Sequence, residues 1–531
     1  GNLSTAAAVS DNQVIYDADQ PGVTVSSTAA DPTNTAPIPV TITFDEAVTG
    51  FTPTSASGDV VITNGTDSNP AGSGTTYTFD LITSGQGAVT VMVPAASGQD
   101  AAGNANTESN TFSITYDSVR PTVTIEQAAA QADPTNASPI HFTVTFSEAV
   151  TGFEDGDVTL GGTAGAATAA VTGSGTTYDV AVSGMTVNGT VLATVADGAA
   201  QDDALNTSEA STSTDNEVNY VVGPVDVTIE QAAAQVDPTN TLPVNFTVVF
   251  SRPISLGSFT PSDLTLGGDA PGVPAATITE IVPNDGTTFN AAVNGLTGSG
   301  TVTVSLAANT VQDTAGNDNS ASASTDNSVS YDIAQPGVTV SSTAADPTNT
   351  APIPVTITFD EAVTGFTPTS ASGDVVITNG TDSNPAGSGT TYTFDLITSG
   401  QGAVTVMVPA ASGQDAAGNA NTESNTFSIT YDSVRPTVTI EQAAAQADPT
   451  NASPIHFTVT FSEAVTGFED GDVTLGGTAG AATAAVTGSG TTYDVAVSGM
   501  TVNGTVLATV ADGAAQDDAL NTSEASTSTD N

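Results

Sequence analysis

The chain has 531 residues, no cysteine, and 57 acidic residues against 3 basic ones, which gives a formal net charge of −54 at pH 7. The only basic residues are Arg120, Arg252 and Arg435, so electrostatic repulsion excludes nucleic acid and anionic membrane surfaces as direct partners. The lack of cysteine excludes disulfide bridges and thiol catalysis. So large an acidic excess predicts neutralisation by divalent cations or by a salty medium, outside a cell.

The chain is built from repeats. Residues 20–216 recur unchanged as residues 335–531, and within this large repeat the phrase that begins at Pro121 returns in modified form at Pro224 and more loosely at Pro21. The large repeat therefore divides into three modules of about 105 residues each. We expect residues 1–19 to hold the terminal strand and linker of a preceding module, and modules one to five to cover residues 20–119, 120–222, 223–334, 335–434 and 435–531.

Each module shows strand patterns only. Apolar and polar residues alternate over residues 112–116, 140–146 and 178–182, and clusters of Gly, Asn, Asp, Ser and Pro separate these runs as turns. About 100 residues and roughly seven short strands are typical of an Ig-type sandwich. The sequence therefore predicts an all-β protein, a linear tandem array of Ig-like Greek-key β-sandwich modules.

Three motifs carry a family resemblance. The stretch IHFTVTFSEAVTGFEDGDVTLGG at residues 140–162, with the later GSGTTYDVAVSGM and QDAAGN-type segments, is similar to the bacterial Ig-like repeats of giant surface adhesins and biofilm-associated proteins. The resemblance covers essentially the whole chain. It implies a non-enzymatic, extracellular role at the bacterial cell surface, as an extender region, often rigidified by calcium, that holds a distal binding domain away from the cell.

Acidic residues recur at the N-terminal end of the modules. An Ig-like strand order brings the incoming linker, the B–C loop and the F–G loop together there, and we call these three positions the joint of a module. Four joints are acidic at all three positions: Asp17, Glu46 and Asp100 in the first module, Asp117, Glu148 and Asp202 in the second, Asp332, Glu361 and Asp415 in the fourth, and Asp432, Glu463 and Asp517 in the fifth. The third joint has Val221, Arg252 and Asp313 instead.

The pattern at the joints favours a cation. Two carboxylates about 5 Å apart repel by roughly 3 kcal/mol at an effective dielectric near 20, so three converging acids would push a joint apart unless a cation lay between them. Several oxygen ligands suit Ca²⁺, whereas Mg²⁺ demands stricter geometry and no Cys or paired His is present for zinc. We therefore predict Ca²⁺ at four joints, with Arg252 in place of the ion at the third. The alternative is that these acids are solvated loop residues of a salt-adapted surface.

Two further sets of aspartates recur. The motif Asp-Pro-Thr-Asn predicts a turn between strands A and B, at the opposite end of each module; its first residues are Asp31, Asp133, Asp237, Asp346 and Asp448. Asp59, Asp157 and Asp263 precede strand C and are candidates for an additional ligand near the joints.

The two ends of the sequence are complementary. Residues 12–16 resemble the last strand of a module, and the sequence reaches Asn531 before the last strand of the fifth module. Two interpretations remain open. Either the sequence is a window on a longer repetitive chain, or it is a subunit that polymerises head to tail because one copy supplies the strand that the next copy lacks. In both cases the partner is another copy of the same modules.

The exact duplication favours a structural stalk or filament, a spacer whose length matters more than any one surface. The alternative function is a set of multivalent modules that bind carbohydrate or protein. Such modules are expected to carry aromatic residues on loops, but the chain has no Trp, and most of its Tyr and Phe residues fall at inward strand positions.

Overall fold

The computed structural model describes residues 13–530. These residues form strands grouped in ten sheets, two for each module, and apart from three 3-10 turns they contain no helix. None of their elements is a helix long and apolar enough to cross a membrane. The predicted all-β tandem array of Ig-like sandwiches is confirmed. The chain forms two compact units. The first consists of the residues up to Asp226 together with the later loops Ser251–Ser258 and Ala308–Ser320, and the second holds the remainder.

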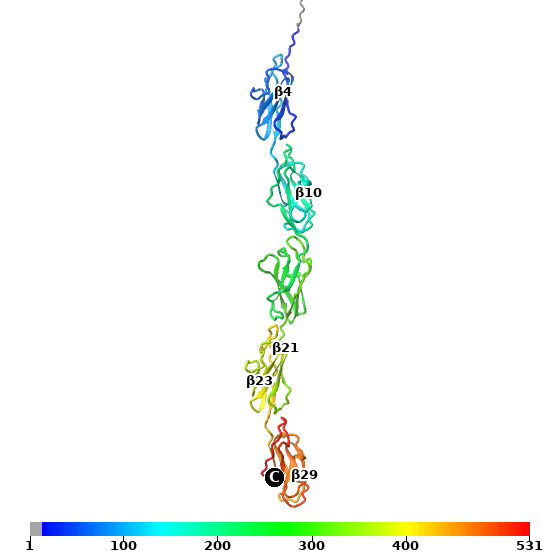
Figure 1. The fold of residues 1–531 in the computed structure, drawn as a ribbon, viewed down its shortest axis with the longest axis vertical. Helices are drawn as coiled ribbons and strands as arrows, with labels where there is room; N and C mark the ends of the chain where they lie inside the picture. The colour runs from blue at the N-terminus through cyan, green and yellow to red at the C-terminus, as the bar shows by residue number, and fades with distance from the viewer. Residues whose placement is uncertain (1–12, 531) are drawn as a thin grey trace, which may run out of the picture. The chain divides into compact units, whose positions relative to one another are not determined.

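The first unit contains the first two modules (Figure 1). The strands of the first are β1 (Val23–Ser26), β2 (Ile38–Val48), β3 (Val61–Thr63), β4 (Gly65–Thr83), β5 (Gly87–Met92) and β6 (Phe112–Tyr116). Those of the second are β7 (Val123–Gln127), β8 (Ile140–Val150), β9 (Val158–Gly161), β10 (Thr168–Ser183), β11 (Gly189–Val195) and β12 (Glu217–Tyr220), with the 3-10 turn η1 (Asp155–Asp157) before β9. The sheet orders are β1-β2-β4 with β3-β5-β6, and β7-β8-β10 with β9-β11-β12.

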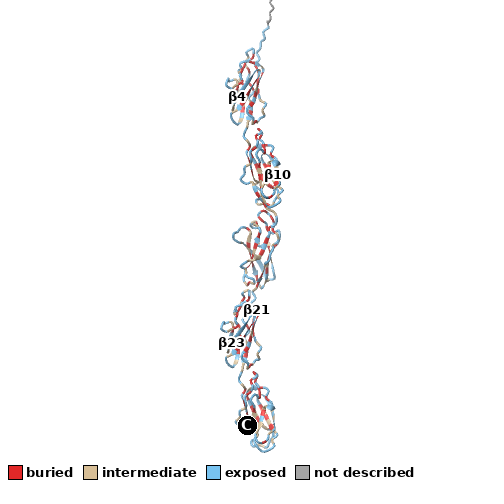
Figure 2. Ribbon diagram, in the orientation of Figure 1, coloured by how far each residue is buried: buried red, intermediate tan, exposed pale blue. Residues whose placement is uncertain are grey.

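The core of each module lies between its two sheets, where Figure 2 shows the buried residues. In the second module Ile140, Phe142 and Val144 of β8 are fully buried, and the residues between them are not. They face Val191 and Val218 of the other sheet within one hydrophobic cluster. Burying one such side chain contributes about 1.5–3 kcal/mol, so the period of two that is visible in the sequence specifies which face of each strand points inward.

β10 supplies two antiparallel arms, which correspond to strands D and E of an Ig-like sandwich. The hydroxyls of Thr168 and Ser183, at its two ends, lie 2.7 Å apart, and the turn between the arms contains Gly173 with φ of +128°. A Cβ at Gly173 would lie 2.6 Å from the carbonyl oxygen of Thr177, so this turn requires glycine. With two arms from β10, the second module has the seven strands of an Ig-like fold, A-B-E-D in one sheet and C-F-G in the other.

Three aromatic rings fill the N-terminal end of the core. Phe146, Phe153 and Tyr178 pack edge to face with ring centroids 5.2–5.8 Å apart. The buried hydroxyl of Tyr178 donates a hydrogen bond of 3.0 Å to the carbonyl oxygen of Val150, at the end of β8. The first, fourth and fifth modules repeat this bond, with Tyr77, Tyr392 and Tyr493 as donors. In the third module Phe289 takes the place of the tyrosine, so the ring remains and the hydroxyl is lost.

The second unit holds the remaining strands. Those of the third module are β13 (Val227–Gln231), β14 (Val244–Phe250), β15 (Leu264–Gly267), β16 (Gly272–Glu280), β17 (Thr288–Leu296), β18 (Gly300–Leu306) and β19 (Ser328–Tyr331), with η2 (Pro261–Asp263). Those of the fourth are β20 (Val338–Ser342), β21 (Ile353–Val363), β22 (Val376–Thr378), β23 (Gly380–Thr398), β24 (Gly402–Met407) and β25 (Phe427–Tyr431). Those of the fifth are β26 (Val438–Gln442), β27 (Ile455–Val465), β28 (Val473–Gly476), β29 (Thr483–Ser498) and β30 (Leu507–Val510), with η3 (Asp470–Asp472).

The sheets of the second unit follow the same plan. In the third module arms D and E are separate strands, and the sheet orders are β13-β14-β17-β16 and β15-β18-β19. The fourth module has β20-β21-β23 and β22-β24-β25. The fifth has β26-β27-β29, but within the described residues its second sheet contains only β28 and β30.

The start of the described chain differs from expectation. Residues 13–20 form no strand, although the sequence predicts one over residues 12–16, of which Asn12 lies outside the described part. The side chains of Val14, Ile15 and Tyr16 are 93%, 83% and 91% exposed. An extended segment becomes a strand only when a partner edge satisfies its backbone groups.

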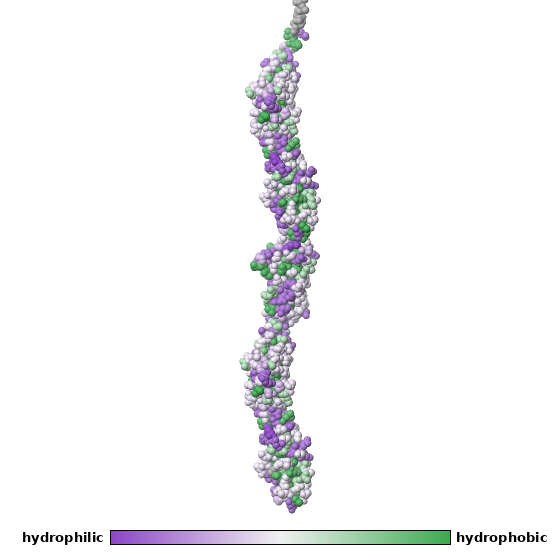
Figure 3. Space-filling view, in the orientation of Figure 1, coloured by the Kyte–Doolittle hydropathy of each residue, from purple (hydrophilic) through white to green (hydrophobic). Residues whose placement is uncertain are grey.

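Elsewhere, on the face drawn in Figure 3, apolar residues appear only as small separate spots.

Candidate metal centres

The joint of the second module is shaped by a β-bulge. The pairing of β8 with β10 shifts register between Thr145 and Val150, and Glu148 lies within the shifted segment. A bulge redirects the side chains of the residues that it contains. The same shift occurs around Glu46, Glu361 and Glu463 of the first, fourth and fifth modules. In the third module β14 ends at Phe250, before Arg252, and its pairing with β17 shows no shift.

A short bridge holds the two loops of the joint together. The amide of Thr151 donates to the carbonyl oxygen of Gln201 at 2.7 Å, and the amide of Gln201 donates back at 2.9 Å. Asp202 follows directly and is 3% exposed. The B–C and F–G loops are therefore fixed side by side, and their acids share one corner of the module.

The structure brings together all four predicted triads. In each of them, one carboxylate oxygen per residue lies within 4.8 Å of the other two. The groups are Asp17, Glu46 and Asp100; Asp117, Glu148 and Asp202; Asp332, Glu361 and Asp415; and Asp432, Glu463 and Asp517. In every group the F–G loop aspartate is buried, and in the first group the linker aspartate is exposed.

Each joint also contains an asparagine that the sequence analysis did not single out. The side-chain amide of Asn206 donates to Asp202 Oδ2 at 2.9 Å and to the main-chain carbonyl oxygen of Asp117 at 2.9 Å. It thereby orients the buried carboxylate and ties the linker to the F–G loop. The same two bonds are made by Asn104, Asn317, Asn419 and Asn521. The signal was present in the sequence, because all five F–G loops read Gln-Asp followed by Asn four residues after the Asp.

The pKa of the glutamate is raised in each of the four triads. Burial raises the pKa of Glu148, and the negative charges of Asp117 and Asp202 raise it further. The pKa values of Glu46, Glu361 and Glu463 are raised by burial first and then by their neighbouring aspartates. The guanidinium of Arg120 pairs with Asp197, which lies outside the triad, at 2.6 Å. Burial and repulsion thus disfavour the ionised form of the glutamate in all four triads.

The third joint contains a positively charged side chain, that of Arg252. Arg252 Nε lies 2.5 Å from Asp313 Oδ2, and its guanidinium also donates to the carbonyl oxygen of Gly223 in the linker. Burial raises the pKa of Asp313, but hydrogen bonds from Asn317 and Arg252, together with the arginine charge, outweigh burial and lower the pKa below its usual value. Arg252 therefore contacts both the F–G loop acid and the linker, the two elements between which the glutamate lies in the other joints.

The donor set of the triads fits a hard divalent cation. Ca²⁺ binds oxygen ligands at 2.3–2.6 Å, so two ligands on opposite sides of the ion are separated by about 4.6–5.2 Å. The three carboxylate oxygens of each triad lie within 4.8 Å of one another, so they are close enough together for one ion to contact all three. Zinc sites favour nitrogen and sulfur ligands, and the acids of these groups offer oxygen alone.

The other predicted aspartates have different roles. Asp157 Oδ2 accepts a hydrogen bond of 2.8 Å from the amide of Glu154 and closes the η1 turn, and Asp263 closes the η2 turn in the same way. Asp59 accepts from the amide of Thr52, seven residues earlier, and closes a wider loop before strand C. None of the three belongs to a triad among the described residues. Asp133, the first residue of a predicted turn, also accepts a bond of 2.9 Å from the amide of Asn219 in β12. This motif therefore fixes the last strand of the module, a role that the turn prediction missed.

Comparison with known proteins identifies part of the chain directly. The family described as bacterial Ig-like domain matches residues 17–116 and residues 332–431. These two segments are bacterial Ig-like domains. Each match begins at the linker aspartate of a joint and ends at the tyrosine that closes strand G, so one bacterial Ig-like domain includes its own complete triad.

Solved structures with distant similarity are also found. FdeC, an adhesin of Escherichia coli, is 17% identical, with 58% of this chain and 98% of that chain covered and a TM-score of 0.31. Invasin, a bacterial integrin-binding protein, is 13% identical, with 79% and 82% covered and a TM-score of 0.32. The S-layer protein SbsC is 14% identical, with 93% and 65% covered and a TM-score of 0.20. No curated protein matches the chain.

Proposed function

We propose that the chain is a non-enzymatic spacer of a bacterial surface, in which Ca²⁺ fastens the linker of four bacterial Ig-like domains to their B–C and F–G loops. The observation that carries the proposal is the contrast between joints: four bring three carboxylates together, and the joint of the third module has the paired guanidinium of Arg252 in place of the glutamate and Val221 in place of the linker aspartate. Burial and then the neighbouring carboxylates raise the pKa of Glu148, and a cation at the triad would offset both effects by favouring the ionised form.

The extracellular location rests on charge and family. A formal charge of −54 opposes compact folding through self-repulsion, and extracellular salt and millimolar calcium counteract it. The spacer role rests on repetition, since residues 20–216 and 335–531 are identical and present the same surface twice. A surface that is copied without change adds length and adds no new specificity.

Calcium titration of the full chain by isothermal calorimetry tests the proposal. We expect four sites, and three after Glu148→Gln, which keeps the size and hydrogen-bonding capacity of the side chain and removes its charge. Asp226→Asn, at an acid outside every triad, is the matched control and should leave four sites. No calcium heat at millimolar concentration, or an unchanged number of sites in Glu148→Gln, would contradict the assignment.

A further inference from the structure

Each linker is held by the module before it through two main-chain amides. At the second joint the amide of Asp117 donates to the carbonyl oxygen of Thr33 at 2.9 Å, and the amide of Ser118 donates to Gln86 Oε1 at 2.9 Å. The same two bonds recur at the third, fourth and fifth joints, with Thr135, Thr239 and Thr348 in place of Thr33 and with Asn188, Ser299 and Gln401 in place of Gln86. Neither bond uses a carboxylate, so the preceding module holds the linker with or without an ion.

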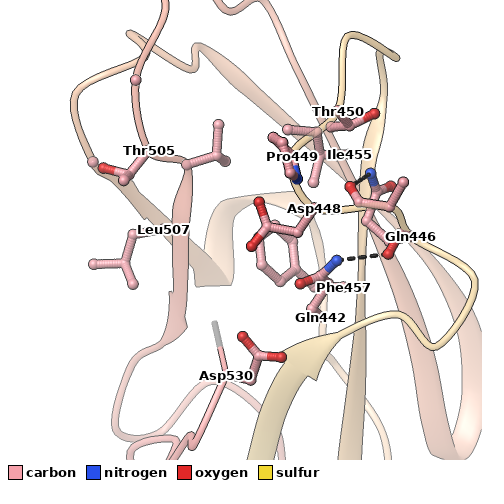
Figure 4. A pocket seen from close by; sticks show the side chains of 14 residues that line it. Gln442, Gln446, Asp448, Pro449, Thr450, Ile455, Phe457, Thr505, Leu507 and Asp530 are labelled. Carbon is pink, nitrogen blue, oxygen red and sulfur yellow. Dashed lines mark hydrogen bonds between the residues drawn. The ribbon is translucent and has the colours of Figure 1, made fainter.

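The A–B loop that accepts the linker is itself fixed to the last strand of its module. The amide of Thr33 donates to the carbonyl oxygen of Thr115 at 2.9 Å, and the amide of Thr115 donates to Asp31 Oδ1 at 2.9 Å. Figure 4 shows the same loop in the fifth module, where its aspartate and threonine are Asp448 and Thr450. The linker therefore starts from a fixed base.

The module after the linker holds the start of its own first strand. The carbonyl oxygen of Pro121 accepts from the amide of Glu209 at 2.9 Å, and that of Pro336 accepts from the amide of Thr422 at 2.9 Å. Two residues then remain between the anchored ends, and we call them the hinge: residues 119–120 at the second joint and residues 334–335 at the fourth. Hinges consist of a few such residues, which absorb a change in backbone dihedral angles.

At the second joint an arginine fastens the hinge to the F–G loop. Arg120 Nε donates to the carbonyl oxygen of Thr207 at 2.8 Å, and the guanidinium also donates to the carbonyl oxygen of Ser208. Its ion pair with Asp197 is exposed and contributes little alone, but hydrogen bonds from a charged donor are about twice as strong as neutral ones. The hinge is thus fixed without a metal ion. At the fifth joint Arg435 makes the same bonds to Thr522, Ser523 and Asp512.

The fourth joint has no such bond. Gln335 stands at the position of Arg120, and Ala410 stands at that of Asp197. Gln335 is exposed, and its side chain forms no hydrogen bond with any residue that the structure describes. Besides the triad, the F–G loop holds this linker through Asn419, whose side-chain amide donates to the carbonyl oxygen of Asp332 at 2.9 Å. The second joint lies within the first compact unit and the fourth within the second.

Each of the three arginines of the chain connects a linker with an F–G loop. Arg120 and Arg435 do so from the linker. Arg252 does so from the B–C loop, since it pairs with Asp313 and donates to the carbonyl oxygen of Gly223, which stands at the linker position of Arg120. No other basic residue is present. Three joints therefore have an arginine, and the first and fourth have a glutamine at the hinge.

We propose that the arginines decide which joints bend when calcium is removed. The fourth joint then opens at its hinge, whereas Arg120 and Arg435 keep the second and fifth joints closed. Calcium would bind at all four triads but would control bending only where no arginine is present. The calcium response in this inference rests on the proposed function, but the contribution of the arginines does not.

Spin labels on the full chain measure bending at single joints. The chain has no cysteine, so cysteine pairs can be introduced at chosen places. Ser330→Cys with Thr339→Cys spans the fourth joint, and Thr115→Cys with Thr124→Cys spans the second at equivalent, exposed positions. Nine residue steps separate each pair (339 − 330 and 124 − 115), so their Cα atoms lie at most about 30 Å apart. By double electron–electron resonance we expect two narrow distance distributions in calcium, of which only that across the fourth joint widens in chelator.

Exchanging the hinge residues sharpens the test. Arg120→Gln should make the second distribution widen in chelator, and the fold tolerates glutamine there because the fourth module has it. Gln335→Arg with Ala410→Asp should keep the fourth distribution narrow, since the carbonyl oxygens of Ala420 and Asn421 stand at the positions of those of Thr207 and Ser208. Asp197→Ala, which removes only the exposed pair, is the control and should change the second distribution little.

The outcomes separate this inference from the proposed function. Equal widening across both joints in chelator, or no effect of Arg120→Gln, would overturn the role of the arginines and leave the calcium sites in place. Distributions that ignore calcium at both joints would contradict the calcium sites instead. The arginines would then still require the fourth distribution to be the wider one in every condition, and equal widths would overturn their role as well.

Discussion

The second and third joints connect the same three elements but have opposite charges at the B–C loop position. In the second, Glu148 lies with Asp117 and Asp202 within one set of oxygens. In the third, Arg252 pairs with Asp313 and reaches the linker carbonyl of Gly223. In both, an asparagine ties the F–G loop to the linker.

The difference shows what the B–C loop position does. The element that changes is the charge at the centre of the joint, and the surrounding bonds remain. Under the proposed function, a joint with a guanidinium needs no ion, whereas a triad of carboxylates takes one. Calcium concentration should therefore act on four modules and leave the third unchanged.

Removal of calcium should produce the largest difference between the two kinds of joint. Calcium at 100–1,000 times its dissociation constant stabilises a module by about 3–4 kcal/mol, which corresponds to a melting shift of roughly 10 °C or more. Hydrogen exchange followed by mass spectrometry should show faster exchange in chelator for peptides around Asp202. Peptides around Asp313, whose sequence is unique, serve as the internal control. Equal acceleration in both would remove the distinction.

Neutralising the buried aspartate should produce the second-largest difference in stability between the two kinds of joint. Asp313→Asn leaves the guanidinium of Arg252 without its charge partner and should cost about 3 kcal/mol with or without calcium. The matched change Asp202→Asn loses an acceptor for Asn206 in both conditions, but should cost more when calcium is present, because only then is a ligand lost as well. Local unfolding free energies from hydrogen exchange distinguish these patterns. A calcium-dependent cost at Asp313 would contradict the salt-bridged joint.

Transplanting the triad should convert the third joint. The double variant Val221→Asp, Arg252→Glu restores an acid at all three positions, while Asn317 still orients Asp313. We expect a fifth calcium site by calorimetry, weaker by about tenfold than the others because β14 lacks the bulge that directs the glutamate. Arg252→Glu alone supplies two acids and should not bind. A stoichiometry that stays at four in the double variant would show that the acids are insufficient.

Acidity should produce a smaller and opposite effect at the two joints when calcium is absent. The pKa of Glu148 is raised above its usual 4.5, so the stability of its joint is greatest below that value and falls as pH rises through the folded pKa. The pKa of Asp313 is lowered below 3.8, so its contribution is present above 3.8 and is lost only as pH falls through the folded pKa.

Between pH 7 and about 4.5 the triad modules should therefore gain in melting temperature, without a matching gain in the third. Calorimetric melting in chelator measures this shift. A chain with glutamine at Glu46, Glu148, Glu361 and Glu463 is the control for the general loss of negative charge on acidification. If that chain gains as much as the unmodified one, the effect does not come from the joints.

Much of this arrangement follows from the sequence. The fold could be predicted because the period of two marks the inward face of β8 in residues such as Phe142 and Val144. The triads could be predicted because Ig-like topology determines which loops meet, independently of atomic detail. The substitution of Arg252 for a glutamate then indicated that the three positions act together, and the structure places it on Asp313.

Other features depend on contacts that no local pattern reveals. The role of Asp133 could not be predicted because its partner, the amide of Asn219, lies far along the chain and any residue type could supply it. The bulge at Glu148 depends on how β8 pairs with β10. Whether residues 13–16 form a strand depends on a partner edge, which their sequence alone does not reveal.

The hydroxyl bonds beneath the joints have a practical consequence. The chain has no tryptophan and nine tyrosines, so tyrosine alone determines its emission. Four of these residues, Tyr77, Tyr178, Tyr392 and Tyr493, donate to the backbone of the strand that carries a triad glutamate, and the third module has Phe289 instead. Each triad therefore has a tyrosine bonded to the strand that carries its glutamate, the third module lacks this tyrosine, and a change in tyrosine emission on adding calcium would report the proposed ion binding without any label.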